Sequence, residues 1–287
     1  MRPELRLAAT ASRQYQVFHR NQALAAGFSS SGIKRRVDAG LWEPMHRGVF
    51  IATGIKVGWE QALMAALLGC GPDAAGSCGS AALVWGVTDA VIRPHVTVKL
   101  EIARKVCGVV VHRSRELDAA FHKGFRVTNP MRTLLDLSSY LSDEPLEIAL
   151  DNAWRKGLLE PMRFARYLDL PRNRARKGSG PLRAMVGLRK PGRPIGSGGE
   201  TKLFRFLRRY GLPTPVPQHP IETRSGFRYA DFAYPEKKIA IEFDSLEWHS
   251  SRLSLTGERI RRNELEEAAP GDSWCMKTTV SSRRSTR

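Results

Sequence analysis

The chain has 287 residues, with 46 Lys and Arg against 28 Asp and Glu, so its formal net charge is +18. This length is enough for two or three domains rather than one. Such an excess of positive charge favours a polyanionic partner, either nucleic acid or an acidic membrane surface.

The composition argues against several classes of protein. No apolar run approaches the ~20 residues that span a bilayer, and the best is ALMAALLGC. The N-terminal stretch MRPELRLAATASRQYQ lacks the apolar segment of a secretory signal. The cysteines show no C-x-x-C spacing and no paired histidines, which argues against zinc and against an extracellular disulfide framework: Cys70, Cys78, Cys107 and Cys275. We therefore expect a cytoplasmic protein that binds nucleic acid and no membrane.

Residues 1–54 carry the pattern of a helix-turn-helix. The stretches ASRQYQVFHR and NQALAAGF are expected to be short helical pieces, the second ending at Gly27. Ser29 or Ser30 can cap the next helix, SSGIKRRVDAG, which stops at Gly40. The stretch LWEPMHRGVFIAT is expected to form a two-stranded wing. The buried side is expected to contain Leu24, Phe28, Ile33 and Val37.

The second helix of this motif is basic on its outward side. Lys34, Arg35 and Arg36 are the candidate DNA contacts, with Arg47 in the wing as a further candidate. A small helical bundle with a solvated basic face is the alternative. The sequence does not tell contacts to base edges from contacts to phosphates.

The segment QALAAGFSSSGIKRRVDAGLWEPMHRGVFIATG resembles the N-terminal DNA-binding domain of AbiEi-type antitoxins, over residues 15–54. The resemblance implies a winged helix-turn-helix, double-stranded DNA as a partner, and a cognate toxin. It extends loosely into residues 55–171, notably through RTLLDL, where it supports an α+β domain.

The middle segment shows structural patterns and no catalytic set. Residues 58–88 are expected to be helical, HVTVKL and GVVVHRS to be strands, and VTNPMRTLLDLSSYL and EIALDNAWRKGLL to be amphipathic helices. Asp136 and Asp151 stand isolated, and His112 is expected to be structural. Residues 172–199 contain eight Lys or Arg, no acid, and repeated Gly and Pro. They are expected to be either a solvated linker or a flexible linker that also binds the phosphate backbone.

Residues 228–244 are expected to form a β-hairpin with one acidic face. If Glu236 and Lys237 form the loop, Asp231 faces Glu242, with Cβ atoms roughly 5 Å apart. Asp244 then lies on the same face. The core face is expected to contain Phe232, Tyr234, Ile239, Ile241 and Phe243.

The acidic face of this hairpin requires an explanation. Like charges placed directly opposite each other destabilise a sheet. A hard cation with oxygen ligands would compensate for the repulsion. The alternative is a solvated face with the register shifted by one residue.

A resemblance also covers roughly residues 196–268. The pattern Asp231, Glu242-x-Asp244 and Trp248-His249 follows the stretch SGGE, which ends at Glu200 and opens the amphipathic segment TKLFRFLRRYGL. Together these features resemble the very-short-patch-repair-like endonuclease domains of the PD-(D/E)XK superfamily. Asp244 stands where that superfamily has its lysine.

This second resemblance implies Mg²⁺-dependent hydrolysis of DNA phosphodiester bonds. It implies that Glu200, Asp231 and Glu242 hold the metal, and that His249 lies near the attacking water or the scissile phosphate. Asp244 completes the candidate catalytic set. Gln218 and Arg228 occupy positions that tend to be polar in such domains.

The final residues, AAPGDSWCMKTTVSSRRSTR, lack the apolar alternation expected for another buried strand. Trp and Met have single codons, so SWCMK is encoded as N TGG TGY ATG AAR. A shift of one base gives the codons NTG GTG YAT GAA. They encode an apolar residue, then Val, then either Tyr or His, and then Glu. We hypothesise that this C-terminal segment is frameshifted, which resequencing of the locus tests.

The sequence thus predicts an α+β multidomain protein with an incomplete restriction-endonuclease-like α/β domain. The predicted parts are a winged helix-turn-helix (1–54), an α+β middle domain (55–171), a basic linker (172–199), a nuclease-like domain (200–268) and an aberrant tail (269–287). Two functions remain open: a metal-dependent DNA endonuclease, and a non-catalytic AbiEi-like repressor or antitoxin with a degenerate nuclease-like domain.

Overall fold

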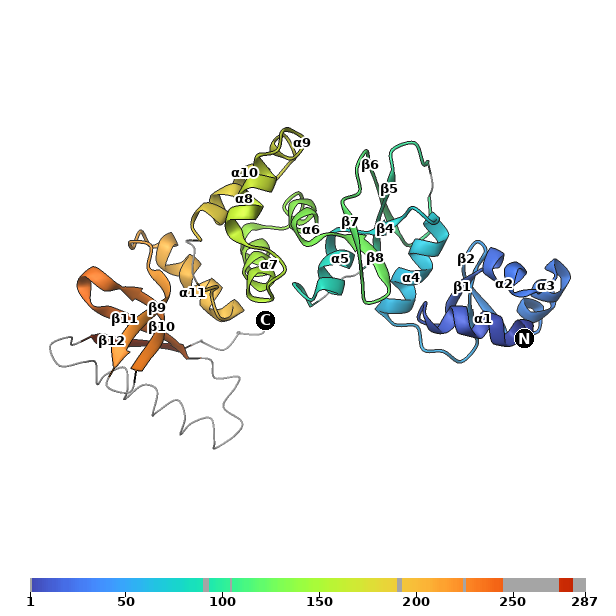
Figure 1. Ribbon diagram of the computed structural model, residues 1–287, viewed down its shortest axis with the longest axis horizontal. Coiled ribbons are helices and arrows are strands. Elements are labelled where there is room, and N and C mark those ends of the chain that lie inside the picture. The colour runs from blue at the N-terminus through green and yellow to red at the C-terminus, as the bar shows by residue number, and fades with distance from the viewer. Residues whose placement is uncertain are drawn as a thin grey trace, which may run out of the picture. The chain divides into compact units, whose positions relative to one another are not determined.

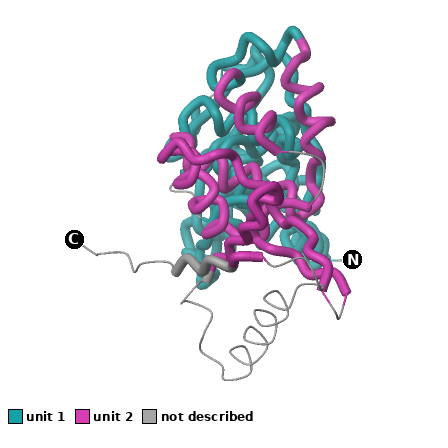
Figure 2. Tube along the Cα trace, turned by 90° about the vertical axis from the view of Figure 1, so that its left-hand side faces the viewer, with its two compact units in different colours: residues 1–141, 171–179 teal, residues 142–170, 180–287 magenta. Residues whose placement is uncertain are grey.

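The computed structural model describes residues 2–89, 93–103, 105–189, 193–223, 226–244 and 274–280. It has the mixed α+β architecture that the sequence predicts (Figure 1). The chain forms two compact units, coloured separately in Figure 2: residues 1–141 with 171–179, and residues 142–170 with 180–287. Within the described ranges, no helix is long and apolar enough to cross a membrane.

The first part of unit 1 is a winged helix. Its elements are α1 (Pro3–Ser12), β1 (Val17–His19), α2 (Arg20–Ala26), α3 (Ser30–Asp38), β2 (Trp42–His46) and β3 (Val49–Ala52). The predicted wing is confirmed, because β2 pairs antiparallel with β3. The helix predicted over residues 11–20 is wrong from residue 13 to residue 19, because α1 ends at Ser12 and a turn follows. There the β-branched and aromatic pair Val17-Phe18 forms a strand against β3, where both side chains are buried.

Local signals set the bounds of α2 and α3 as predicted. Gly27 adopts φ 108° at the end of α2, a left-handed conformation that glycine tolerates best. The Ser29 hydroxyl accepts a hydrogen bond from the Gly32 N–H at 3.0 Å and caps α3. Phe28 and Ile33 are buried as expected, but Leu24 is 39% exposed and lies outside the core.

The second part of unit 1 is built on a five-stranded sheet in the order β6-β5-β4-β8-β7. The helices α4 and α5 and the strands β5 and β8 share one apolar core. The elements are α4 (Trp59–Cys70), β4 (Ala75–Gly76), α5 (Cys78–Trp85), β5 (His95–Lys99), β6 (Val110–Ser114), β7 (Ala119–His122), β8 (Phe125–Thr128), α6 (Pro130–Leu137) and α9 (Pro171–Arg174). The predicted strands at 95–100 and 108–114 and the helix beginning near Pro130 are therefore present.

The segment 172–199 differs from the predicted flexible linker. It contains most of α9 and all of α10 (Ser179–Gly187), and its arginines have acidic partners within the protein. Arg172 pairs with Glu116 at 2.8 Å, and Arg176 lies 3.8 Å from Asp136. The Gly and Pro content suggested flexibility, but these ion pairs fix residues 171–179 within unit 1.

Unit 2 combines helices with a four-stranded sheet in the order β12-β11-β10-β9. Its remaining elements are α7 (Asp143–Arg155), α8 (Pro161–Asp169), α11 (Gly198–Arg209), β9 (Val216–Thr223), β10 (Gly226–Tyr234), β11 (Ile239–Asp244), β12 (Cys275–Val280) and a 3₁₀ turn (Pro235–Lys237). No pattern predicted β9, which contains two prolines. Its position at the sheet edge explains how they are tolerated, since an edge strand has N–H groups that need no partner strand.

The predicted hairpin register is confirmed. Phe232 pairs with Ile241, Ala233 with Ala240 and Tyr234 with Ile239, which is the pairing that brings Asp231 and Glu242 together. Lys238 closes the turn in a left-handed conformation with φ 50°. The predicted core face is also present, because its five side chains pack with Phe204 and Leu207 of α11: Phe232, Tyr234, Ile239, Ile241 and Phe243.

The tail predicted to be aberrant contributes a strand. Residues Cys275–Val280 form β12, which pairs parallel with β11. Backbone hydrogen bonds to an open strand edge do not require apolar alternation, and the run Thr278-Thr279-Val280 is β-branched. The frameshift hypothesis itself stays a prediction.

A buried ion-pair network joins α7 to α11 in unit 2. Arg189 donates to both carboxylate oxygens of Asp151, at 2.9 and 2.8 Å, and to Glu147 at 2.8 Å. Arg205 and Arg208 of α11 also donate to Glu147, and the Thr201 hydroxyl donates to Asp151 at 2.9 Å. Asp151, expected to be isolated, is therefore fully engaged.

Burial alone would raise the pKa of Glu147. Arg189 and Arg205 outweigh that effect and hold the pKa of Glu147 below its usual value. The charges in this network are thus satisfied by partners rather than by water.

We predict that Arg189→Ala destabilises unit 2 by about 3–5 kcal/mol, because it leaves two buried carboxylates without their main partner. Hydrogen exchange of the α7 and α11 amides in the full chain measures this change. Arg166→Ala, an exposed arginine of α8, is the matched control and should stay within about 0.5 kcal/mol. Equal protection in both variants would show that the network contributes little.

Candidate functional site

Two of the predicted DNA contacts lie on the exposed side of α3. Lys34 is 76% exposed at its side chain and pairs with Asp38 one turn later at 2.6 Å. Exposed pairs of this kind are weak, so the ammonium group can exchange its partner for a phosphate. Arg35 is exposed. Arg47 is exposed in the turn between β2 and β3, next to Gly48, whose φ of 76° makes the turn tight.

Arg36 differs from its neighbours, because its side chain is only 23% exposed. Its guanidinium lies 4.5 Å from the Phe28 ring centroid and 5.7 Å from that of Trp42. It also donates to Glu4 of α1 at 2.8 Å. These contacts anchor α3 to α1 and to the aromatic core, so the structure gives Arg36 a packing role in place of the predicted outward position.

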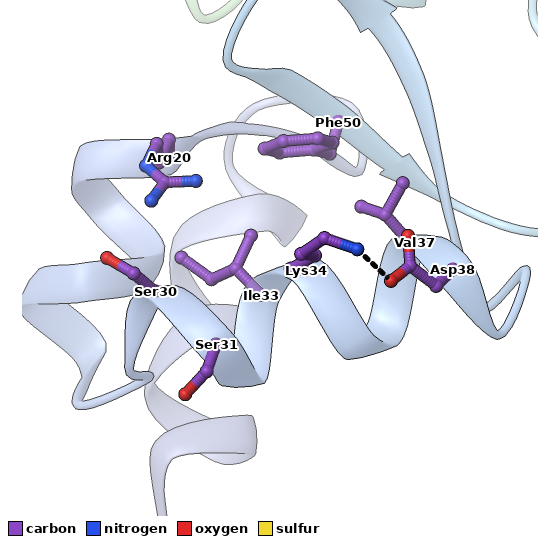
Figure 3. Close-up of a pocket in the computed structure, with 8 residues that line it drawn as sticks. All are labelled: Arg20, Ser30, Ser31, Ile33, Lys34, Val37, Asp38 and Phe50. Carbon is purple, nitrogen blue, oxygen red and sulfur yellow. Dashed lines mark hydrogen bonds and ion pairs between the residues drawn. The ribbon is translucent and has the colours of Figure 1, made fainter.

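A shallow hollow runs along one side of α3, from Ser30 to Asp38 (Figure 3). Its lining comes from α2, α3 and β3: Arg20, Ser30, Ser31, Ile33, Lys34, Val37, Asp38 and Phe50. The dashed contact in Figure 3 is the Lys34–Asp38 pair. Hydroxyl, guanidinium and ammonium donors therefore surround the first turns of α3. Arg20 was not among the residues that the sequence predicted to contact DNA. Its position at the start of α2 is consistent with a residue that contacts the DNA phosphate backbone.

The second candidate site is the carboxylate cluster of unit 2, defined here as Glu200, Asp231 and Glu242. Glu200 lies in the first turn of α11 and is 7% exposed, and Asp231 on β10 is 9% exposed. The amide nitrogen of Gln218 on β9 donates to both, at 3.2 Å to Glu200 and 3.3 Å to Asp231. The amide thus lies between two carboxylates from different elements.

Backbone groups also donate to these carboxylates. The Gly196 N–H donates at 2.8 Å to the Glu200 oxygen that accepts from Gln218, and the Phe243 N–H donates at 2.9 Å to the other oxygen of Asp231. The Asp231 N–H is 3.3 Å from a Glu242 oxygen. Asp231 and Glu242 are therefore adjacent, as predicted. Within the described parts of the chain, however, the three carboxylates do not form a group whose ligand atoms all lie within 4.8 Å of one another.

The rest of the predicted catalytic set cannot be placed. Asp244 ends β11 by its backbone, and its side chain lies outside what the structure describes. His249 lies outside the described residues altogether.

The electrostatic environment of Glu200 opposes ionisation. Burial is the main cause and the Asp231 carboxylate adds to it, so together they raise the pKa of Glu200. Hydrogen bonds from Gly196, Ser197 and Gln218 oppose the shift only in part. A group with a raised pKa next to a second carboxylate is typical of functional sites.

Comparison with known proteins gives a family for the N-terminal part. Residues 5–53 match the family described as "Transcriptional regulator, AbiEi antitoxin". This match supports the DNA-binding prediction for the winged helix that contains α3. It ends before α4 and does not reach the carboxylate cluster.

Longer matches link the chain to mycobacterial proteins. The uncharacterized proteins MT2308 and Rv2248 of Mycobacterium tuberculosis are each 26% identical over 202 residues, which is 69% of this chain and 72% of theirs. The crystal structure of the RV2827C protein from the same organism is 16% identical, with a TM-score of 0.41, and the match covers 67% of this chain and 84% of that one.

We predict that Glu200→Gln removes a pH-dependent loss of stability. The pKa of Glu200 is higher in the folded state than in the unfolded state. The stability that the protonated Glu200 side chain contributes is therefore complete below the unfolded-state pKa, and it is lost as the pH rises through the folded-state pKa. With chelator present, the melting temperature of Glu200→Gln relative to wild type should therefore increase from about pH 4 to pH 8. The exposed Glu222→Gln on β9 is the matched control. A difference that does not vary with pH would contradict the prediction.

Proposed function

We propose that the chain is a DNA-binding transcriptional regulator of the AbiEi antitoxin type, which contacts double-stranded DNA through α3 and the β2–β3 wing. One observation carries the proposal. The segment that matches this family exposes Lys34 and Arg35 on the second helix of its helix-turn-helix, with Arg47 on the wing. A helix of this kind fits the major groove, and a wing can reach the adjacent backbone.

The charge of the chain supports the same proposal. A formal charge of +18 attracts DNA through counterion release, independently of base sequence. The family description adds a second partner, because an antitoxin acts on a toxin. We therefore propose a cognate toxin as the protein partner.

We predict that alanine at Lys34, Arg35 or Arg47 weakens binding to a duplex selected by the wild-type protein from a random library. The loss should be about 1–3 kcal/mol for a base contact and less for a phosphate contact. Each phosphate contact removed should lower the salt slope by about one. Fluorescence anisotropy across a salt series measures both quantities.

Arg36→Ala separates recognition from packing in the same experiment. Because Arg36 is held by Phe28, Trp42 and Glu4, its loss should lower the melting temperature while leaving the salt slope unchanged. Arg6→Ala, an exposed arginine of α1, is the control for a general loss of charge. If Lys34→Ala, Arg35→Ala and Arg47→Ala all bind like Arg6→Ala, the proposed interface is wrong.

A metal-dependent DNA endonuclease is the second candidate function. The specific observation in its favour is the convergence of two buried carboxylates on one positively polarised group, the amide of Gln218. Buried acids that share a donor in this way offer oxygen ligands to a hard cation.

The cluster fits Mg²⁺ by its donor chemistry. Asp231 and Glu242 would hold the ion, and Glu200 would bind it directly or through a water molecule. The Gln218 amide would first have to move from its position between Glu200 and Asp231. The bound ion would supply Lewis-acid activation of water and neutralise charge on a DNA phosphate. The chain's own groups contribute the carboxylates and the backbone N–H donors of Gly196 and Phe243 that orient them.

We predict that Mn²⁺ or Mg²⁺ raises the melting temperature of the wild-type full chain and that Asp231→Asn removes most of this increase. Binding to the folded state alone would stabilise it by about 2.7 kcal/mol at a hundredfold excess over Kd. Without metal, Asp231→Asn should be no less stable than wild type, since a like-charge repulsion is relieved.

Nicking of supercoiled plasmid by the same variants tests the chemistry separately. Metal-dependent nicking that Asp231→Asn abolishes would support the endonuclease. A thermal response without nicking would leave a metal-binding regulator with no nuclease activity. A thermal response that is absent, or equal in both proteins, would eliminate the metal site and leave only the regulator.

A further inference from the structure

Three potential metal ligands meet on the sheet of unit 1, far along the chain from both candidate sites. They are Cys78, His95 and His112, whose ligand atoms all lie within 4.8 Å of one another. Among the residues that the structure describes, no other set of three or more Cys, His, Asp or Glu side chains brings its ligand atoms this close together. We refer to it as the Cys-His-His cluster.

The sheet topology brings these residues together from two neighbouring strands, β5 and β6, and from the start of α5. β5 and β6 run parallel with Thr97 opposite His112, so His95 and His112 lie on the same face. Cys78 follows β4, the other neighbour of β5. Backbone contacts on both sides of Cys78 hold it against His95. The Ser77 N–H donates to the His95 carbonyl at 2.9 Å, and the His95 N–H donates to the Ser80 hydroxyl at 2.8 Å.

The two distances from His112 Nε2 correspond to edges of a tetrahedral zinc site, and all three ligand atoms lie within 4.8 Å of one another. Zn–N bonds of about 2.05 Å and a Zn–S bond of about 2.3 Å place two nitrogens about 3.3 Å apart, and a nitrogen and a sulfur about 3.6 Å apart. In the structure, His95 Nδ1 lies 3.1 Å from His112 Nε2, and Cys78 Sγ lies 3.6 Å from the same Nε2. We propose that Cys78, His95 and His112 bind a single Zn²⁺ ion, with the fourth position open.

Hydrogen bonding alone accounts less well for this arrangement. An imidazole nitrogen makes a single hydrogen bond, either as donor or as acceptor, whereas His112 Nε2 lies close to both a ring nitrogen and a thiol. Cys78 also has φ 50°, a left-handed conformation that is costly for a residue with a side chain. A metal ion would satisfy all three donor atoms at once and offset that cost.

The surroundings provide the outer contacts of such a site. Asp136 acts electrostatically on both Cys78 and His112, and its Oδ2 atom is buried without a hydrogen-bond partner among the described residues. When His112 coordinates through Nε2, its Nδ1–H requires an acceptor, which Asp136 would supply. Both histidines are half-buried, so an ion can reach them from solvent.

Titration of the full chain with Co²⁺, followed by competition with Zn²⁺, tests this proposal. All proteins carry Cys107→Ser and Cys275→Ser, because these exposed thiols could bind metal adventitiously. We expect a thiolate-to-cobalt charge-transfer band that saturates at one ion per chain and disappears when Zn²⁺ is added. This band requires a cysteine ligand, so it distinguishes the cluster from the carboxylates of unit 2.

Three variants assign the ligands. Cys78→Ser should abolish the band, His112→Gln should weaken Co²⁺ binding by at least about 10–100-fold, and Asp136→Asn should weaken it by about 10–100-fold. Cys70→Ser is the matched control, a buried thiol of the same unit outside the cluster, and should keep the band. Circular dichroism of each metal-free variant confirms that it is folded.

The thermal response of the parent protein gives an independent measurement that needs no variant at the cluster. Zn²⁺ should raise its melting temperature, and excess chelator should reverse the increase. A parent protein without the band and without this response would overturn the proposal. A band that persists in Cys78→Ser but is lost in Cys70→Ser would overturn it as well.

Discussion

The buried pairing of Arg189 with Glu147 and Asp151 is the constraint on which unit 2 depends. Three charges removed from water are tolerable only when each is neutralised by a partner with good geometry. Arg189 therefore holds the segment after α10 against α7, and Arg205 and Arg208 of α11 bind the same Glu147 carboxylate and fix α11 beside α7. Since α11 begins close to Glu200, the network also sets where the carboxylate cluster can form. A helix that the sequence assigned to the middle domain thus supports a site more than 40 residues later in the chain.

Patterns confined to neighbouring residues predicted the structure well. Strand alternation fixed the 228–244 hairpin and its register, and capping signals fixed α2 and α3, because these features depend on backbone conformation and on one buried face. Elements that depend on distant partners were missed. Val17–His19 forms a strand only because β3 lies beside it, and β9 tolerates two prolines only because it is an edge.

The candidate sites show the same contrast between features set by neighbouring residues and features that depend on distant ones. Asp231 and Glu242 were predicted to be adjacent from register alone, whereas the amide of Gln218 between two acids depends on a strand that no pattern indicated. The Cys-His-His cluster has no short spacing motif, because its residues come from the start of α5 and from two separate strands. Net charge was informative but incomplete. Several arginines, including Arg36 and Arg189, are used within the protein, so fewer than the composition suggests can face DNA.

The return of residues 171–179 to unit 1 has a consequence for how such proteins can be divided or recombined. The chain passes between the units three times, near residues 141, 170 and 179, instead of once. A truncation that begins at α11 would omit α7 and Arg189 and leave the basic residues of α11 without their buried acid. Exchange of the whole of unit 1 between homologous genes likewise requires compatible junctions at all three crossings. The two units are therefore expected to be inherited together rather than shuffled as independent modules.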